Sequence, residues 1–370
     1  MVFPLGPYHP ALTEPLGVQF ALRGETITDV AVTAGYTHRG VEALVVGHTL
    51  ADALDVIERT CGSDGHSLRL AACLALEAHA GITPPERARA LRTIFSEVER
   101  LQARLWYLMQ IARVSQFGAL LTACVEARES LFEACVSATE TRLFWGIATP
   151  GGARGIADPL ALQGALSDIE GNIATIERLL NDRGPMIRRL TNVGVIPTEA
   201  IDLAGVTGAV ARASGSENDL RLTAPYDAYG DLDLESMLNT EQVKSLIGDV
   251  GSRAFLAVAE IRQSMAIIEA LLDELPDGQE ASAFPALLEP GTASATVESP
   301  HGQTTVTLTI GASGGKSADT QTADWLTELT IQPASVATAA LLPAVLTRQK
   351  LSDALVILTS LDLCVACLDR

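Results

Sequence analysis

Three cysteines constrain how this chain can fold, because they belong to two short motifs near opposite ends of the sequence. Cys364 and Cys367 form a Cys-x-x-Cys pair close to the last residue, Arg370. Far upstream, Cys61 begins a stretch of the same spacing whose second position is Asp64 instead of cysteine. Two residues between ligands let one tight turn aim both side chains at one metal. If the motifs act together, the fold must join them in a site one sulfur short of four thiolates.

The pair Cys364 and Cys367, taken alone, allows several interpretations. It can be a redox dithiol, half of a zinc site, or two buried hydrophobic side chains. The Arg-x-Cys-Gly context of Cys61 favours a site shared with the pair. The other cysteines stand at apolar positions of helical patterns, where small core residues are expected: Cys73, Cys124 and Cys135.

The composition indicates a globular protein. A chain of 370 residues with 48% hydrophobic content can bury a large core as one big domain or two ordinary ones. We find no clear linker, and therefore expect a single domain over residues 1–370. The formal net charge of −19 comes without a basic cluster to offset it. Such a chain repels phosphate backbones, so nucleic acid is not an expected partner.

The sequence also indicates a compartment. The first ten residues contain neither a basic stretch nor an apolar run, so no secretory signal is recognised. Six cysteines are too few for a disulfide scaffold at this length, which favours a reducing cytoplasm. The apolar stretch 336–346 falls short of the ~20 residues that a membrane-spanning helix needs. We expect any membrane anchor to lie in other subunits.

Hydrophobic periodicity predicts a mainly helical chain with two β-rich parts, residues 16–33 and 295–332. Alternation over 16–32, broken at Gly24, predicts a β-hairpin, and segments 294–311 and 325–332 alternate as paired strands. Helix starts and apolar spacings of three and four then predict the helices. These are a long helix that begins after Pro84 and Pro85, and helices over 120–145, 160–180, 240–274 and 337–357.

Motifs along almost the whole chain carry a resemblance to a known family. Residues 6–11 read Gly-Pro-x-His-Pro-Ala, and residues 38–42 read His-Arg-Gly-x-Glu. Further matching segments are PPERARALRTIFSEVERL, Gly151-Gly152, TGAVARASGSENDLR, PYDAYGDLD, VESPHG and SLDLCVACLDR. Together they resemble the large subunit of group 4 NiFe hydrogenases, the energy-converting, membrane-bound class of formate hydrogenlyase type. The relative of that subunit, the 49-kDa-type quinone-site subunit of respiratory complex I, is similar as well.

The resemblance implies a fold and a site. The fold is mainly α with small β elements: a NiFe-hydrogenase large-subunit-like helical bundle with an N-terminal β-hairpin, a C-terminal β region, and both Cys motifs at one face. The site is a NiFe centre in an oxidoreductase subunit. By position, Cys61 and Cys364 match terminal nickel ligands and Cys367 matches one bridging ligand. Asp64 replaces the other bridging cysteine, so these four residues are the predicted metal ligands.

The chain departs from the hydrogenase pattern in further places. Leu68 stands where the motif has its histidine, with His66 two residues out of register, and Gln332 stands where we expect an arginine. A carboxylate such as Asp64 is a hard ligand that bridges soft, low-spin iron and nickel poorly. Three thiolates and a carboxylate can still hold one zinc, nickel or iron ion.

The resemblance also implies partners and further site residues. A small subunit with a [4Fe-4S] cluster docks alongside, near His38 and Arg39, and membrane-arm subunits hold the chain peripherally on the cytoplasmic face. Glu14 is the predicted proton relay for a nearby thiolate. In the complex I branch, His9 donates a hydrogen bond to a quinone. Gly62, however, stands where that branch has its tyrosine.

Simpler roles remain open for these residues. His9 can cap its loop, Glu14 can be a solvated acid, and Asp64 can cap the following helix. Glu97 and Arg100 are expected to form a local ion pair, since they lie one helical turn apart.

Three functions follow from the sequence. The first is electron transfer between an iron–sulfur subunit and a substrate at the Cys61, Cys364 and Cys367 cleft, with protons and H2 as one candidate substrate. The second is a complex I-type subunit that takes a quinone or another small acceptor. The third is a non-catalytic docking subunit.

Overall fold

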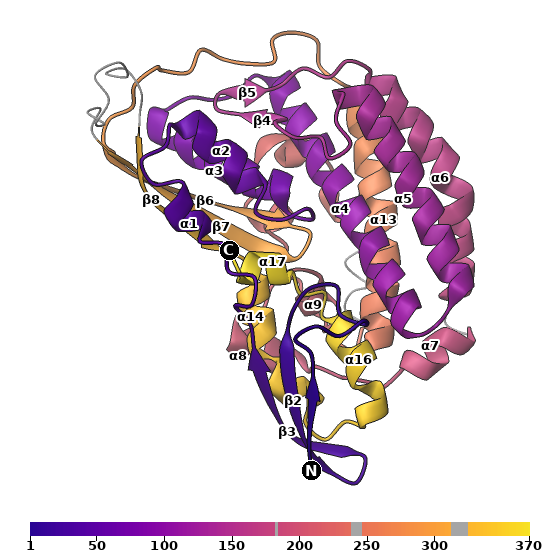
Figure 1. Ribbon diagram of the computed structural model, residues 1–370. Helices are drawn as coiled ribbons and strands as arrows, with labels where there is room; N and C mark the ends of the chain where they lie inside the picture. Colours follow the sequence, from indigo (N-terminus) through magenta and orange to yellow (C-terminus); the bar gives the residue numbers. More distant parts are fainter. Residues whose placement is uncertain (182–183, 238–245, 312–324) are drawn as a thin grey trace.

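A bundle of long helices forms one side of the molecule in the computed structural model, which describes residues 1–181, 184–237, 246–311 and 325–370 (Figure 1). Its members are α4 (Glu86–Val114), α5 (Gly118–Thr139), α6 (Pro159–Leu179) and α13 (Val250–Asp273). Helix α4 packs against both α5 and α13, and α5 packs against α6. The periodic apolar residues of α4, from Leu91 to Leu108, are buried, which confirms the predicted long helix.

Two predicted helices end or begin elsewhere than expected. The helix over 120–145 stops at Thr139, because Glu140 adopts a left-handed conformation with φ of 61°. The helix over 240–274 begins at Val250, where the Asp249 carboxylate accepts a 2.6 Å hydrogen bond from the Ser252 N–H. Residues 240–245 of that prediction lie outside the described residues.

The predicted helix over 337–357 is wrong as a single element. It consists of α14 (Ser335–Ala340), α15 (Leu342–Leu346) and α16 (Leu351–Ser360). Pro343 lies in the first turn of α15, where a helix does not need its N–H. A proline cannot continue α14, because it lacks the N–H that the next turn of that helix would use. Arg348, with φ of 72°, then turns the chain between α15 and α16.

The N-terminal sheet has the order β1-β2-β3, with antiparallel pairs throughout. Strands β2 (Gly17–Arg23) and β3 (Thr26–Thr33) form the predicted hairpin, with Gly24 at a positive φ in the turn. Strand β1 (Val2–Leu5) was not predicted, because it is too short to show alternation.

The second sheet lies on the other side of the molecule from the helical bundle (Figure 1). It has the order β6-β7-β8, formed by β6 (Gly291–Ser299), β7 (Gly302–Gly311) and β8 (Trp325–Gln332), and thus confirms the predicted C-terminal strands. Helix α3 (Gly65–Ala80) packs on β6 and β7, and α2 (Leu50–Glu58) packs on α3. Helix α3, which directly follows the Cys61 segment, therefore lies on this sheet.

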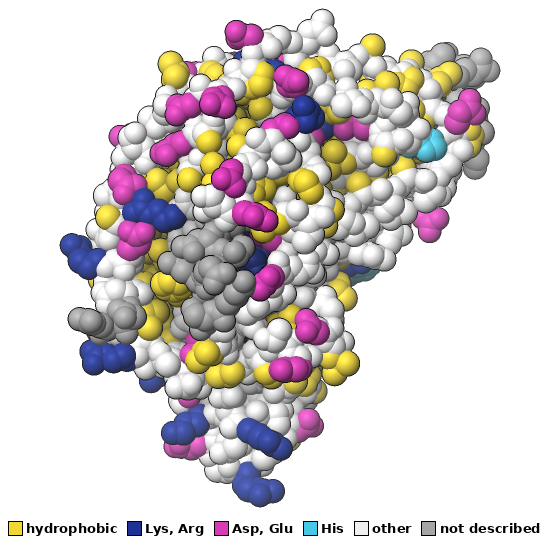
Figure 2. Space-filling model, turned by 180° about the vertical axis from the view of Figure 1, so that it is seen from behind, with side chains coloured by type: hydrophobic (Ala, Val, Ile, Leu, Met, Phe, Trp, Pro, Cys, Tyr) yellow, Lys and Arg dark blue, Asp and Glu magenta, His cyan; other side chains and the backbone are white. Residues whose placement is uncertain are grey.

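Short elements connect these parts. They are α1 (Val41–Leu44), β4 (Ala148–Thr149), β5 (Gly152–Ala153), α7 (Pro185–Leu190), α8 (Thr198–Ala204), α9 (Gly208–Arg212), α10 (Leu220–Thr223), the 3-10 helix η1 (Asp227–Asp231), α11 (Leu234–Met237) and α17 (Val365–Leu368). None of the helices in the described ranges has the length and apolar character to cross a bilayer. On the face drawn in Figure 2, acidic side chains are scattered, and the coloured Lys and Arg side chains form no continuous basic surface.

The last residues lie in the middle of the molecule, where the bundle and the two larger sheets approach one another (Figure 1). The Asp369 carboxylate accepts hydrogen bonds from the Gly35 N–H at 2.6 Å and the Thr37 N–H at 2.9 Å. Arg39 donates to the carbonyls of Thr60 at 2.8 Å and Ala366 at 2.5 Å. The C-terminal segment is thus fastened to the segments before α1 and before α3.

Candidate metal centre and its cavity

The structure brings the four predicted ligands together. The ligand atoms of Cys61, Asp64, Cys364 and Cys367, here called the Cys/Asp cluster, all lie within 4.8 Å of one another, and all four residues are buried. The sulfurs of Cys61 and Cys367 are 3.3 Å apart, and the Cys367 sulfur is 3.7 Å from Asp64 Oδ2. Such spacing suits side chains that share one ion.

Helix ends position the cluster. Cys61 precedes α3, Asp64 is the N-cap residue of α3, and Cys364 is the N-cap residue of α17. The Ser335 hydroxyl accepts the Cys364 N–H at 3.0 Å and so fixes the start of α17. Because Arg39 binds both Thr60 and Ala366, it clamps the two Cys segments against each other.

Asp64 does not cap α3 through its side chain, so that simpler role is wrong. Both carboxylate oxygens instead lie 2.8 Å from Nδ1 of His301. The opposite nitrogen, Nε2, lies 3.8 Å from Asp362 Oδ1. Burial opposes a charged imidazole, but the Asp64 and Asp362 carboxylates outweigh it and raise the pKa of His301 to about 9. Asp64 and His301 therefore form an ion pair beside the thiols.

Close backbone contact holds His301 in place. His301 lies in the tight turn between β6 and β7, against the start of α9. A Cβ on Gly208 would lie 2.4 Å from the His301 carbonyl oxygen and 2.5 Å from the Gly302 Cα. Only glycine permits this approach, so Gly208 helps to set the position of His301.

The thiols of the cluster differ in their pKa. Hydrogen bonds from the Cys364 and Cys367 thiols hold the pKa of Cys61 well below its usual range. Contacts with Cys364 and with Cys61 raise the pKa of Cys367 well above its usual range. Cys61 is thus the thiolate of the group, and thiolates are the metal-binding form of cysteine.

The donor set fits a single ion better than a metal pair. Three sulfurs and one carboxylate within 4.8 Å suit one four-coordinate zinc, nickel or iron ion. A nickel–iron pair needs two bridging thiolates, and Asp64, which holds His301, stands at the second bridging position. The site therefore lacks that bridge, and a NiFe centre stays a prediction.

A cavity of about 470 Å³ opens from the cluster. Cys61, Cys364 and His301 line one part of it, together with Glu14 and Asp362. Much of the remaining wall is apolar or aromatic and comes from the N-terminal loop, α4, the segment after α5, and α16. This wall includes Leu12, Leu16, Ala103, Trp106, Leu143, Phe144 and Leu358. The cavity can hold a small organic molecule next to the thiols.

Glu14 lies at this cavity and is not a solvated loop acid. Its carboxylate accepts a 3.0 Å hydrogen bond from the Ala366 N–H, between the two C-terminal cysteines. Burial raises the pKa of Glu14 above its usual value. A carboxyl group with a raised pKa keeps its proton to a higher pH than a solvated one, which suits a group that carries a proton.

The other predicted site residues lie outside the cluster. His9 accepts a 3.1 Å hydrogen bond from the Ala11 N–H in its own loop and is not among the residues that line the cavity. His38 is exposed, and Arg39 holds the Cys segments as described. A role for His38 and Arg39 at a subunit interface stays a prediction.

Sequence reasoning missed several residues of the site. His301 and Asp362 stand in the matching segments VESPHG and SLDLCVACLDR, so those motifs were the available signal. Glu99 is also buried nearby and accepts the N–H groups of His66 at 2.7 Å and Ser67 at 3.0 Å. Burial and the charge of Asp64 raise the pKa of Glu99 well above its usual value.

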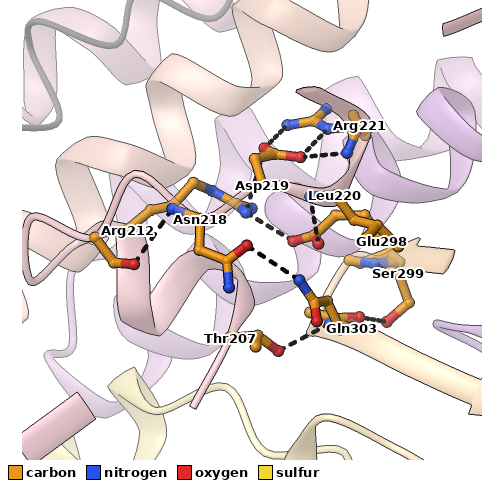
Figure 3. Close-up of polar contacts among 12 residues, drawn as sticks. Thr207, Arg212, Asn218, Asp219, Leu220, Arg221, Glu298, Ser299 and Gln303 are labelled. Carbon is orange, nitrogen blue, oxygen red and sulfur yellow. Dashed lines mark hydrogen bonds and ion pairs between the residues drawn. The ribbon is translucent and has the colours of Figure 1, made fainter. Parts of the chain in front are cut away.

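Buried ion pairs lead away from the cluster into the bundle. Arg104 links Asp362 at 2.7 Å to Glu260 at 2.8 Å. Arg212 binds the other oxygen of Glu260 at 2.8 Å and Glu298 at 2.7 Å. Figure 3 shows how this network continues through Arg212, Asp219 and Arg221.

The predicted ion pair of Glu97 and Arg100 is confirmed at 3.4 Å. Both side chains are fully buried, so this is not a surface pair. Arg221 and the hydroxyls of Tyr229 and Ser264 also bind Glu97.

Comparison with known proteins identifies the class to which this fold and site belong. Residues 117–292 match the family of the 49-kDa subunit of respiratory-chain NADH dehydrogenase. The carbon monoxide-induced hydrogenase of Rhodospirillum rubrum is 28% identical over 371 residues, which cover 99% of this chain and 98% of the relative. The chain is an oxidoreductase subunit of the hydrogenase and complex I type.

Two further relatives carry the names of NADH-quinone oxidoreductase and F(420)H(2) dehydrogenase. An NADH-quinone oxidoreductase subunit of Thermodesulfovibrio yellowstonii is 30% identical over 75% of this chain and 69% of its own length. An F(420)H(2) dehydrogenase subunit of Methanosarcina mazei is 29% identical, covering 75% of this chain and 74% of its own. The chain belongs to the 49-kDa subunit family of respiratory NADH dehydrogenase, which is similar to the hydrogenase large subunit.

Proposed function

We propose that this chain is the large subunit of a complex in which electrons pass between an iron–sulfur cluster of a neighbouring subunit and a substrate beside the Cys/Asp cluster. One observation carries the proposal: the cluster of Cys61, Asp64, Cys364 and Cys367 borders a cavity large enough for a small molecule. Buried thiols in contact with one another, with a carboxylate and a charged histidine, have no simple structural purpose.

The Cys/Asp cluster holds one metal ion in this proposal. When bound, a redox-active ion there would supply the point of electron exchange with the substrate. Cys61, Cys364 and Cys367 would hold it as thiolates, and Asp64, which is paired with His301, would be the fourth ligand. The arrangement derives from a NiFe centre in which one bridging cysteine has been replaced.

The residues around the metal have separate tasks. Glu14 takes up or delivers the proton that accompanies electron transfer, because it borders the cavity and its pKa is raised by burial. His301 keeps Asp64 in position and supplies positive charge beside the thiolates. The apolar walls of the cavity exclude water from the reacting groups.

The neighbours of the chain follow from the same proposal. An iron–sulfur small subunit with a [4Fe-4S] cluster docks near His38 and Arg39, close to the clamp over the two Cys segments. Membrane-arm subunits anchor the complex, which places this chain peripherally on the cytoplasmic face of the membrane. The R. rubrum relative, named a hydrogenase, makes protons and H2 the first substrate to test.

A quinone or similar small acceptor is the second candidate substrate. Two observations favour it: relatives are named NADH-quinone oxidoreductase subunits, and the cavity wall is largely apolar. His9, predicted to contact a quinone, bonds within its own loop, and in this alternative His301 is the cavity imidazole.

Metal analysis of the purified complex, combined with activity assays, tests the proposal. We expect about one metal ion per chain, lost in Cys364→Ser, and electron transfer that is lost with it. Infrared bands of CO and cyanide with nickel and iron would identify a complete NiFe centre. Quinone-dependent activity without metal would select the second candidate. Absence of metal and of both activities would overturn the proposal and leave a docking subunit.

A further inference from the structure

The cavity has a polar part that the Cys/Asp cluster does not use. Arg128 of α5 and Gln110 of α4 both line it. Nε of Arg128 and Oε1 of Gln110 are buried and have no hydrogen-bond partner among the described residues. Arg128 also forms no ion pair with any residue in the described ranges. Buried polar atoms are rarely left unpaired, so this pair of atoms points to a ligand.

Two aromatic rings lie against the Arg128 guanidinium. Its central carbon lies 5.1 Å from the Trp106 ring centroid and 4.5 Å from that of Phe132. Rings over the guanidinium leave its N–H edge as the surface for hydrogen bonding. That edge matches the two oxygens of a carboxylate. Burial lowers the pKa of Arg128, although the charge of the nearby Glu129 carboxylate opposes this shift.

Gln110 lines the same cavity as Arg128. It follows Trp106 by four residues on α4, so the two side chains lie one above the other on one helix face. Arg128 also contacts Trp106, and Oε1 of Gln110 has no partner among the described residues. A ligand bound to Arg128 can therefore carry a donor group for the Gln110 oxygen.

Charged side chains are distributed unevenly along the cavity. Glu99, at the cluster, and Gln110 are eleven residues apart on α4, which corresponds to about 16 Å along the helix. Acidic groups surround the cluster part, namely Glu14, Glu99 and Asp362. The cationic side chains among the described residues that line the cavity are Arg128 and His301, and His301 already pairs with Asp64. A carboxylate in the cavity is therefore attracted to Arg128, the cation without a paired carboxylate.

We propose that Arg128 and Gln110 form a subsite for a small hydroxy acid, whose carboxylate binds Arg128 and whose hydroxyl donates to Gln110. As a substrate site this rests on the proposed function. As a binding site it is independent, because binding is measured whether or not the complex turns over. The rest of such a molecule lies along the apolar wall toward the cluster.

Calorimetric titration of the purified full-length chain with three matched compounds tests the subsite. Mandelate carries a carboxylate and a hydroxyl, phenylacetate lacks the hydroxyl, and 1-phenyl-1,2-ethanediol lacks the carboxylate. We expect mandelate to bind about tenfold or more tightly than the diol, since a charge-assisted pair is lost. Arg128→Met should remove this preference, and Gln110→Leu should remove the smaller preference for mandelate over phenylacetate.

Arg142→Met is the matched control. Arg142 also lies over Phe132, at 4.3 Å, but it pairs with Glu129 at 2.7 Å and is half exposed. Its loss should leave mandelate affinity within twofold of wild type. Arg128→Lys keeps the charge and serves if Arg128→Met fails to fold. Equal affinity for mandelate and the diol, or an unchanged affinity in both Arg128 variants, would overturn the proposal. Metal content of the same samples reports separately on the Cys/Asp cluster.

Discussion

Asp64 is the residue that most determines what the Cys/Asp cluster can bind. It lies where a fourth thiolate would complete the set, and both of its oxygens contact His301. A carboxylate is a harder ligand than a thiolate, and this carboxylate is also paired with the buried His301. The metal preference of the site therefore differs from that of a four-thiolate centre.

Replacing Asp64 with cysteine should restore a soft four-sulfur set. We expect Asp64→Cys to bind Co²⁺ with a stronger thiolate-to-cobalt charge-transfer absorption than wild type, because that absorption grows with the number of thiolate ligands. Asp64→Asn, of nearly the same shape, should bind roughly tenfold more weakly than wild type, since a neutral amide is a poorer ligand. Equal spectra for wild type and Asp64→Cys would show that position 64 does not face the metal.

Glu14 can be tested without disturbing its surroundings. Glu14→Gln retains an oxygen that accepts the Ala366 N–H but cannot carry a proton. We expect turnover to fall by roughly 10²–10⁴-fold, the range for loss of a general acid or base. Metal content should stay unchanged. Turnover within a few-fold of wild type would exclude Glu14 as the proton carrier.

At the scale of elements, the position of the β6–β7 turn depends on its contact with the start of α9. Gly208 has φ of +74° and meets the backbone of the turn, whereas Gly205 has φ of +65° and meets nothing within 4 Å. The two positions share the strain of a left-handed residue and differ only in the close approach.

Alanine substitutions at Gly205 and Gly208 separate the effect of backbone strain from the effect of the contact with the β6–β7 turn. Gly205→Ala should lower the free energy of unfolding by about 1 kcal/mol through strain alone. Gly208→Ala should lower it by about 3 kcal/mol, since the new methyl group displaces the turn that carries His301. Urea unfolding gives both values. Similar losses for both variants would mean that the α9 contact does not position the turn.

The buried ion pairs of the bundle predict a particular acid sensitivity. Burial alone would raise the pKa of Glu260, but Arg212 and Arg104 outweigh it and lower the pKa to about 2. The stabilisation is complete above the unfolded value near 4.5 and is lost as pH falls toward 2. A shift of this size corresponds to roughly 3 kcal/mol.

Glu260→Gln should therefore destabilise the protein by at least ~3 kcal/mol at pH 7, because it leaves two buried arginines short of a partner. The difference from wild type should shrink as pH falls below 4.5. Glu269→Gln on the same helix is the control, since Glu269 is exposed and should change stability by less than ~0.5 kcal/mol. A pH-independent difference would contradict the ion-pair explanation.

Over the whole molecule, strong periodicity and the motifs that resemble a known family were good predictors. The long helix α4, the hairpin β2–β3 and the meeting of Cys61 with Cys364 and Cys367 were all expected. Helix ends were less predictable, because single residues such as Glu140 and Pro343 set them.

The environment of the cluster was the least predictable part. His301 comes from a strand turn far from the cysteines in sequence, and Arg104 joins Asp362 to the bundle through tertiary contacts alone. Such pairings depend on how separate elements pack, which local patterns do not encode.

X-ray absorption spectroscopy at the edge of the metal in the purified complex would count the atoms bound to the ion in the Cys/Asp cluster. We expect one metal ion per chain with three sulfur neighbours at about 2.3 Å and one or more lighter atoms at about 2.0 Å, as three cysteines and Asp64 would supply. A spectrum dominated by oxygen and nitrogen, or a complex without stoichiometric metal, would contradict it.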